Sequence, residues 1–473
     1  MDSRYKKLGK NTFLVFLGTA GSKLITLLML PYYTRMLSTA AYGISDLVYT
    51  YSSIMLSMVT CCIADAIFIF PKNADEDGRK RYFTSGIVFS VVSFALWATI
   101  TGIVGGFGGE GTISKYAWWI YGLTLSTFIQ YYMQQFSLSI ERVSVYSITG
   151  IINVACIAGF AFLLMPGFGL IGYLLSMIIA NIVAGTFSFI AAEAYKYFDI
   201  NSLSKPHLTE LLKYGVPLIP NTIMWWIVNG INRPIMEANL GLDAVGIYAV
   251  ANKFPAVLTM LFTVFSNAWI ISMLEEFEKP DFNSFFNKTV KVLFYGMSLF
   301  TVFFILCSKI IVTIFAAPEF YEAWRYMPIL TVGILLSCMS GLIGGIFSAE
   351  KKSKYFFYSS IWGAASSLVL TLLGVKFFGL MGVCVAVAVS FLIMVVVRLK
   401  YAWKYINLFD LKYYAFMFLL ILCSCVAMIV VNSCFLVLLT AFTVIVVMYT
   451  INRNETQYLL KTAVGYLKNY RNK

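Results

Sequence analysis

Long apolar segments dominate this chain and restrict what it can fold into. A bilayer core about 30 Å thick is crossed by about 20 consecutive apolar residues in a helix. The 473-residue sequence holds fourteen segments of this kind, and no loop between them is long enough to form a folded domain. Their approximate ranges are 12–35, 42–66, 83–105, 116–138, 146–165, 170–195, 211–236, 244–273, 290–315, 327–347, 356–377, 380–399, 413–431 and 434–451.

The composition agrees with a membrane protein. Hydrophobic residues make up 60% of the chain and charged residues 12%, whereas soluble domains carry about 25% charged residues. The basic N-terminus precedes an apolar run that is too long for a signal peptide and lacks a small-residue cleavage site, so we expect a retained first transmembrane helix. We therefore predict an all-α membrane protein with 14 transmembrane helices.

Basic residues are distributed unevenly between the two sets of loops. The 35 Lys and Arg residues concentrate at both termini and in alternate loops, such as those around 72–81, 196–213, 279–291, 351–354 and 398–412. The positive-inside rule then predicts that both termini are cytoplasmic, which requires an even number of spans. This bias accounts for most of the net charge of +13 without any nucleic-acid partner.

The sequence also contains an internal repeat. The motif formed by Pro31, Leu37, Ala41, Gly43 and Ile44 recurs 203 residues later as Pro234, Leu240, Ala244, Gly246 and Ile247. A second motif, Phe168-Gly169-Leu170, recurs as Phe378-Gly379-Leu380 at an offset of 210 residues. We predict two pseudo-symmetric six-helix lobes of the same topology around a central cavity. The expected lobes are 1–203 and 204–404, followed by helices 13 and 14 and a basic tail at 405–473.

Two lysines fall near the middle of predicted spans. Lys23 lies about 11 residues into the first span, or roughly 16 Å along a helix, and Lys253 lies at a similar depth in the eighth. A centred lysine costs about 2.5–3.5 kcal/mol on insertion scales. We interpret both as cations that line a hydrated cavity and attract an anion; the alternative is a structural lysine paired with a carboxylate or with helix-end carbonyls.

Further charges lie at the ends of predicted spans. Arg35 and Arg233 are near outer ends, where an arginine either lines the cavity or reaches the headgroups. Asp46 either neutralises Arg35 across the short turn or titrates or binds a coupling cation. Asp65, near the inner end of the second span, is the other candidate for ion coupling. Pro217 and Pro220 predict a kink in the seventh span.

These residues resemble a known family. The chain is similar to bacterial polysaccharide biosynthesis flippases, the Wzx-type O-antigen exporters, over nearly its whole length. The resemblance lies in Gly21-Ser22-Lys23-Leu24, Pro31-Tyr32-Tyr33-Thr34-Arg35, Tyr42-Gly43-Ile44, Tyr214-Gly215-Val216-Pro217, Val245-Gly246-Ile247-Tyr248 and Ala251-Asn252-Lys253. The family typically has an aspartate before the helix 7 arginine, whereas this chain has Asn232 before Arg233.

The resemblance implies the fold of the multidrug/oligosaccharidyl-lipid/polysaccharide exporter superfamily. It also implies a transporter rather than an enzyme, located in the bacterial inner membrane, which moves a sugar repeat unit on undecaprenyl diphosphate to the outer leaflet. Lys23, Arg35, Arg233 and Lys253 would meet the diphosphate, and Asn221, Asn229 and Asn267 would meet the sugars. No cofactor is implied beyond a coupling ion, H⁺ or Na⁺, bound at Asp46 or Asp65.

Partners and rival functions follow from the same resemblance. It implies a polymerase and a chain-length regulator of the same pathway as partners. A flippase for lipid II or another lipid-linked glycan remains an alternative. A drug/cation antiporter of the same fold would want acidic residues in the cavity, and a membrane glycan polymerase would be expected to carry a large outward loop.

Overall fold

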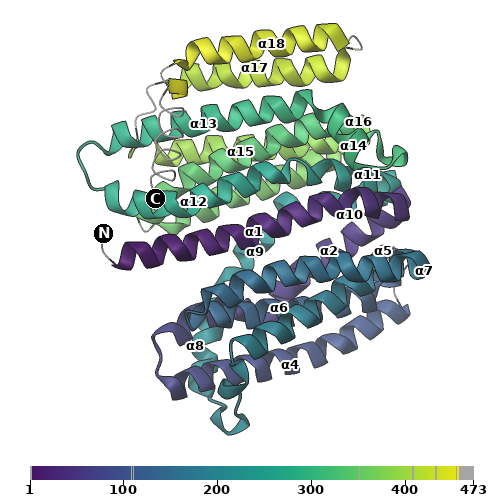
Figure 1. The fold of residues 1–473 in the computed structure, drawn as a ribbon, viewed down its shortest axis with the longest axis vertical. Helices are drawn as coiled ribbons and strands as arrows, with labels where there is room; N and C mark the ends of the chain where they lie inside the picture. The colour runs from purple at the N-terminus through teal and green to yellow at the C-terminus, as the bar shows by residue number, and fades with distance from the viewer. Residues whose placement is uncertain are drawn as a thin grey trace, which may run out of the picture. The chain divides into compact units, whose positions relative to one another are not determined.

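The computed structural model describes residues 3–107, 109, 111–350, 352–406, 410–431, 434–453 and 455–457, which form helices and no strands (Figure 1). The α-helices are α1 Ser3–Met36, α2 Thr39–Thr60, α3 Ile63–Ile69, α4 Glu76–Phe107, α5 Thr112–Lys115, α6 Ala117–Ser139, α7 Val143–Ala191, α8 Lys205–Gly215, α9 Ile219–Asn229, α10 Asn232–Leu240, α11 Leu242–Lys253, α12 Ala256–Glu276, α13 Phe282–Leu306, α14 Ser308–Phe315, α15 Ala323–Ala349, α16 Ser353–Ala402, α17 Leu411–Val430 and α18 Cys434–Ile451.

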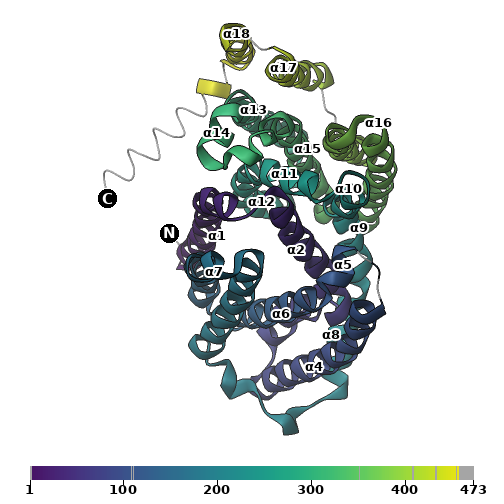
Figure 2. The ribbon, with the colours of Figure 1, turned by 90° about the vertical axis from the view of Figure 1, so that its right-hand side faces the viewer.

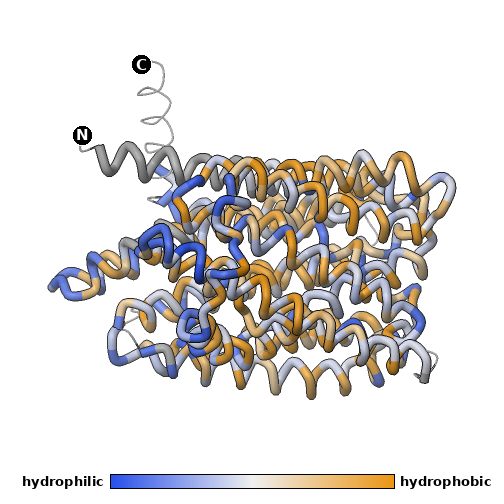
Figure 3. Tube along the Cα trace, turned by 90° about the horizontal axis from the view of Figure 1, so that it is seen from below, coloured by the Kyte–Doolittle hydropathy of each residue, from blue (hydrophilic) through white to orange (hydrophobic). Residues whose placement is uncertain are grey.

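The helices carry the apolar surface that a bilayer requires. Within the described ranges, seven helices are long and apolar enough to cross a membrane, or eight if the bent pair α2 and α3 counts as one span. Apolar residues run along the helices, and hydrophilic residues gather mainly at helix ends (Figure 3). The predicted all-α membrane class is confirmed, and the count of fourteen spans stays a prediction.

Two of the long helices are tight hairpins. α7 reverses at Gly169 (φ 52°) and α16 at Gly379 (φ 57°), the two glycines of the second repeated motif. A positive φ favours glycine because a side chain would be strained there. A Cβ on Gly172 would lie 2.4 Å from the Leu164 carbonyl oxygen, and one on Gly382 would lie 2.0 Å from that of Gly374. These close approaches show that α7 and α16 each fold back on themselves, as expected from the separate spans predicted before and after each glycine.

The chain divides by packing into two compact units, residues 1–249 with 315–320, and residues 250–314 with 321–473. In the first unit, α6 packs against α7 and against α4 (Figure 2). Its core joins Phe83 of α4 to Tyr132 and Phe136 of α6, and the Tyr132 hydroxyl donates to the Phe83 carbonyl at 2.9 Å. The lobe boundaries expected at 203–204 and 404–405 concern the repeats and stay a prediction.

In the second unit, α15 is surrounded by α12, α13 and α16. The glycines of α15 allow this close packing: a Cβ on Gly341 would lie 3.0 Å from the Phe262 ring, and one on Gly345 would lie 3.0 Å from Nε1 of Trp269. α16 is tied to α15 by the buried Arg398, which donates from Nη1 to the Ser340 carbonyl at 2.6 Å. α17 and α18 pair with each other and with α13.

An ion-pair cluster joins the two ends of the α7 hairpin. Arg142 precedes the first arm and donates to Glu193, just beyond the second arm, at 2.8 Å and to the Ala191 carbonyl at 3.1 Å. Lys196 also donates to Glu193. Hydrogen bonds from Lys196 and Arg142 lower the pKa of Glu193 to about 2, whereas an ordinary glutamate titrates near ~4.3.

This cluster predicts a pH-dependent stability with a definite sign. Because the folded pKa of Glu193 is the lower one, the contribution is present above about pH 4.3 and is lost as the pH falls toward 2. We expect Glu193→Gln to lower the apparent melting temperature slightly at pH 7. The difference from the wild-type chain should shrink between pH 4 and 2, and high salt should weaken it at neutral pH. A difference that grew on acidification would contradict this assignment.

Candidate functional site

The segment expected as one seventh span is divided into three helical pieces. α8 leads into a 3-10 turn at Val216–Leu218, where Pro217 removes a backbone donor, so the α-helix is interrupted at the prolines, where a kink was predicted. A second interruption, between α9 and α10 at Gly230 and Ile231, was not predicted. The Gly230 backbone N–H donates to the Trp226 carbonyl at 2.6 Å, which ends α9. This second break places Arg233 in the first turn of a new helix.

Arg233 forms an ion pair with Asp46 of α2. Its Nε donates to Oδ2 of Asp46 at 2.5 Å, and each side chain is only 11% exposed. Nη1 donates to the Asn229 carbonyl at 2.5 Å, an acceptor left without an intrahelical partner by the break. The guanidinium also lies over the Tyr248 ring, 5.3 Å from its centroid. Arg233 is therefore held by a carboxylate, a helix end and an aromatic face together.

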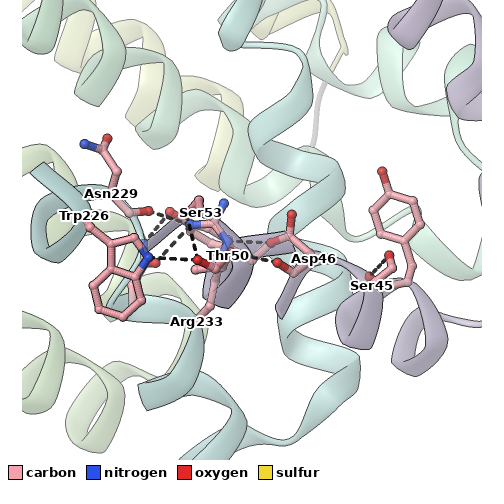
Figure 4. A network of polar contacts seen from close by, with 10 residues as sticks. Ser45, Asp46, Thr50, Ser53, Trp226, Asn229 and Arg233 are labelled. Atoms are coloured by element: carbon pink, nitrogen blue, oxygen red, sulfur yellow. Dashed lines mark hydrogen bonds and ion pairs between the residues drawn. The ribbon is translucent and has the colours of Figure 1, made fainter. Parts of the chain in front are cut away.

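A second set of contacts joins α9 to α2 beside the ion pair (Figure 4). Nε1 of Trp226 donates to the Thr50 carbonyl at 3.0 Å. The Thr50 hydroxyl in turn donates to the Asp46 carbonyl at 2.7 Å, one turn earlier in α2. The Trp226 contact holds α9, the helix before Arg233, against the turn of α2 that carries Asp46.

Asn232 takes the position where the resembling family typically has an aspartate. It is buried, donates to the Tyr248 hydroxyl at 2.6 Å and accepts from Nη1 of Arg233 at 3.2 Å. A neutral amide there leaves the negative charge opposite Arg233 to Asp46. Asp46 thus pairs with Arg233 of a distant helix and not with Arg35 across the turn.

The two copies of the first repeated motif lie directly against each other. A Cβ on Gly246 would lie 1.9 Å from the Thr39 carbonyl oxygen, and one on Gly43 would lie 2.3 Å from that of Leu242. The Thr39 hydroxyl donates to Asp243 across the same contact. α2 and α11 therefore approach at backbone distance, one turn away from Asp46, which follows Gly43 by three residues.

The structure brings three of the candidate residues together: Asp46, Arg233 and Asn229, the last through its backbone carbonyl. The Asn229 side chain bonds instead to the Trp225 carbonyl at 2.9 Å. Asp65 lies on α3 and accepts from the Tyr131 hydroxyl at 2.8 Å. Asn221 lies half-buried near the start of α9. Asp65 and Asn221 therefore stand outside the ion-pair network.

The two candidate cations of α1 have exposed side chains. Lys23 and Arg35 form no ion pair with any residue that the structure describes. The neighbouring Ser22 donates to the Gly150 carbonyl of α7 at 3.0 Å, which fixes the adjoining face of α1. Lys253 ends α11, is half-buried and belongs to the second unit. The side chain of Asn267 lies outside the described part of the chain.

Several residues of the site were not found from the sequence. Trp226, Thr50 and Tyr248 carry no charge and lie in apolar segments, so nothing marks them as neighbours of an ion pair. One signal did exist for the close contact of α2 and α11. Gly43 and Gly246 occupy equivalent places in the repeat, and a pseudo-two-fold relation would bring equivalent turns together at its axis.

Comparison with solved structures gives the fold. The chain superimposes on a structure described as lipid II flippase MurJ in an inward closed conformation, with a TM-score of 0.69 and 17% identity, covering 94% of this chain and 99% of that one. It matches an inward-facing multidrug resistance MATE family transporter of the MOP superfamily with a TM-score of 0.62 and 14% identity, covering 82% and 94%. A MOP superfamily transporter from Pyrococcus furiosus matches at 0.57 and 13%, covering 84% and 96%.

These similarities establish a transporter fold, and at such identities they show nothing beyond the fold. No curated protein matches the sequence. A family model described as polysaccharide biosynthesis protein matches residues 8–275, which is more than half of the chain and includes the whole ion-pair network. The chain therefore belongs to the polysaccharide biosynthesis protein family.

Proposed function

We propose that the protein is a flippase that moves an undecaprenyl-diphosphate-linked oligosaccharide repeat unit from the cytoplasmic to the outer leaflet by alternating access. The observation that carries this proposal is the Arg233–Asp46 ion pair, in which the Asp46 carboxylate binds the Arg233 guanidinium at a helix break. The family match to polysaccharide biosynthesis proteins and the likeness to a lipid II flippase structure support a lipid-linked saccharide as cargo. The ion pair supports a means of holding its diphosphate.

Arg233 suits a diphosphate because a guanidinium binds phosphate oxygens through two parallel N–H donors. In the ion pair its Nε is occupied by Asp46. A phosphate oxygen would take the place of the carboxylate, and Asp46 would then lose its cation. Substrate binding would thereby release Asp46, which makes Asp46 the first candidate to bind the coupling ion, H⁺ or Na⁺.

Lys23 and Lys253 complete the proposed anion path. A charged lysine within a membrane span is kept only where it gains a partner or water, and Lys23 has an exposed side chain within α1. Arg35 would serve the outer end of the same path, while Asn221, Asn229 and Asn267 would contact the sugars. Asp65, bonded to Tyr131, stays the second candidate for ion coupling. With both termini in the cytoplasm, the polymerase and chain-length regulator would receive the product on the outer side.

The lysines are tested by substitution in cells that export the glycan. We expect Lys23→Ala and Lys253→Ala each to reduce surface glycan at least tenfold while the protein inserts at normal levels, because each removes a cation from the diphosphate path. Staining of the surface glycan with immunoblotting of the membrane fraction measures both. Lys115→Ala, an exposed lysine outside the proposed path, is the matched control. Full export by both lysine variants would overturn the anion path.

The rival functions are separated by transport in proteoliposomes. A fluorescent undecaprenyl-diphosphate trisaccharide, ethidium and lipid II are offered separately. Protection of the trisaccharide lipid from an external quencher, lost in Arg233→Ala, is the expected result. Preferred transport of ethidium would instead identify a drug/cation antiporter, and preferred transport of lipid II would identify a lipid II flippase.

A further inference from the structure

The second unit contains an apolar cavity beside a polar pocket. The cavity, of about 290 Å³, lies between α13, α15, α16 and α17, and its lining is apolar or aromatic apart from the hydroxyl of Tyr414. Representative lining residues are Phe286, Phe294, Ile343, Leu392, Leu399 and Phe418. The polar pocket, of about 570 Å³, lies at the start of α13 and of α17. Tyr414 lines both.

Two helices each present a polar and an apolar stripe to these spaces. The polar pocket is lined on α13 by Ser284, Asn287 and Lys291, and the cavity is lined on the same helix by Phe286 and Phe294. Asp410, immediately before α17, lines the polar pocket, and Phe418 of α17 lines the cavity. Tyr414 lines both spaces, and its ring centroid lies 5.2 Å from that of Phe294. The two spaces therefore form one amphipathic site: a polar mouth at the helix ends and an apolar interior running up the helices.

The size of the interior fits a hydrocarbon chain. From Phe286 to Phe294 the lining follows α13 for eight residues, which is about 12 Å of helix. An open apolar space at a membrane surface is filled by lipid, since nothing in it can satisfy water. The apolar cavity is accessible because Ala415 and Val396, which line it, are both exposed.

The charges of the mouth select the headgroup. Lys288, Lys291, Asp281 and Asp410 line the pocket, so both signs are present. Lys291 is also paired with Glu455 at 3.1 Å, which further offsets its charge. A purely anionic headgroup would meet two carboxylates here. A zwitterionic headgroup places its phosphate at the lysine side and its ammonium at the aspartates, where charge-assisted hydrogen bonds form.

We propose that this site binds a zwitterionic glycerophospholipid of the phosphatidylethanolamine class, with one acyl chain in the cavity between α13 and α17. The lipid joins α17 to α13 and α15, and so stabilises the second unit. This inference does not depend on the cargo proposed above, because binding is measured without any lipid-linked glycan.

The test uses the full chain in phosphatidylcholine nanodiscs, to which phosphatidylethanolamine, phosphatidylglycerol or undecaprenyl phosphate is added. Phosphatidylethanolamine should raise the apparent melting temperature by several degrees and persist as a bound adduct in native mass spectrometry. Ala415→Trp, which places a large ring at the exposed edge of the apolar cavity, should remove the shift, and Asp410→Asn should reduce it. Val426→Trp, on an exposed position of α17, and Lys279→Gln, which is outside the pocket, are the matched controls. An equal or larger shift with phosphatidylglycerol, or displacement by undecaprenyl phosphate, would overturn the assignment.

A second measurement tests the proposal independently, in case one of these variants fails to fold. A photo-crosslinking benzoylphenylalanine at Val396, an exposed lining position, should capture phosphatidylethanolamine from native membranes. Capture of another lipid class, or of none, would contradict the proposal.

Discussion

Replacing Arg233 by alanine is expected to abolish export and to destabilise the first unit. The substitution leaves Asp46, 11% exposed, without its cation, and breaking a buried ion pair costs about 3–5 kcal/mol. It also removes the donor to the Asn229 carbonyl at the break between α9 and α10. The apparent melting temperature should fall by several degrees, measured together with surface glycan.

A neutral pair separates folding from transport. In Asp46→Asn with Arg233→Gln, no buried charge is left unpaired, so we expect most of the stability to return. Export should stay absent, because the Arg233 guanidinium is no longer there to hold the diphosphate. Arg81→Ala on α4 is the control, since Arg81 is exposed and lies outside the proposed anion path. Normal export by the neutral pair would show that the ion pair is structural only.

The proposed ion coupling is tested by measuring how transport by one of these single variants depends on the pH gradient. Asp46→Asn alone mimics the protonated acid and leaves Arg233 available to an anion. We expect this variant to bind an undecaprenyl-diphosphate lipid at least as tightly as the wild-type chain and to transport it without dependence on the pH gradient. Binding weaker than wild type, or transport that still follows the gradient, would exclude Asp46 as the coupling group.

Local chemistry made part of this architecture predictable. The apolar segments gave the helical membrane class, because hydrocarbon forces backbone groups to bond within a helix. Gly169 and Gly379 marked the two hairpin reversals, since each adopts a positive φ. The interruption of the helix near Pro217 was also predictable, because proline cannot donate to the helix hydrogen-bond ladder. The break at Gly230 was not, since a lone glycine inside an apolar segment is usually tolerated.

The ion pair shows where sequence reasoning stops. Arg233 and Asp46 were each recognised as candidates, but Asp46 has Arg35 much nearer in the sequence. Its partner was decided by the approach of α2 to α10, which depends on Trp226 reaching Thr50 and on Gly43 meeting α11. Contacts of this kind come from tertiary packing. Lys23 illustrates the converse, since its place in a long apolar segment is visible in the sequence, but it forms no ion pair with any described residue and its role stays a prediction.

Gly246→Ala is expected to have the second large effect, because the added carbon would lie 1.9 Å from a backbone oxygen, that of Thr39. A backbone atom within a helix cannot rotate away, so α2 and α11 must separate. Overpacking of this kind typically costs about 1–3 kcal/mol, and here it also breaks the Thr39–Asp243 hydrogen bond. We expect lower thermal stability and export reduced at least tenfold.

The matched control and a cross-link show whether this contact must open during transport. Gly159→Ala adds the same carbon to α7 with nothing within 4 Å, and alanine favours a helix by about 1 kcal/mol over glycine, so it should be neutral or slightly stabilising.

In a background without the nine native cysteines, Thr39→Cys with Asp243→Cys should cross-link on oxidation, stop transport and recover on reduction. If α2 and α11 stay in contact throughout the cycle, the cross-linked protein will transport normally, and the loss in Gly246→Ala will reflect instability alone. If the contact opens to release cargo, the cross-link will block release while substrate binding persists, a combination that lost stability cannot produce.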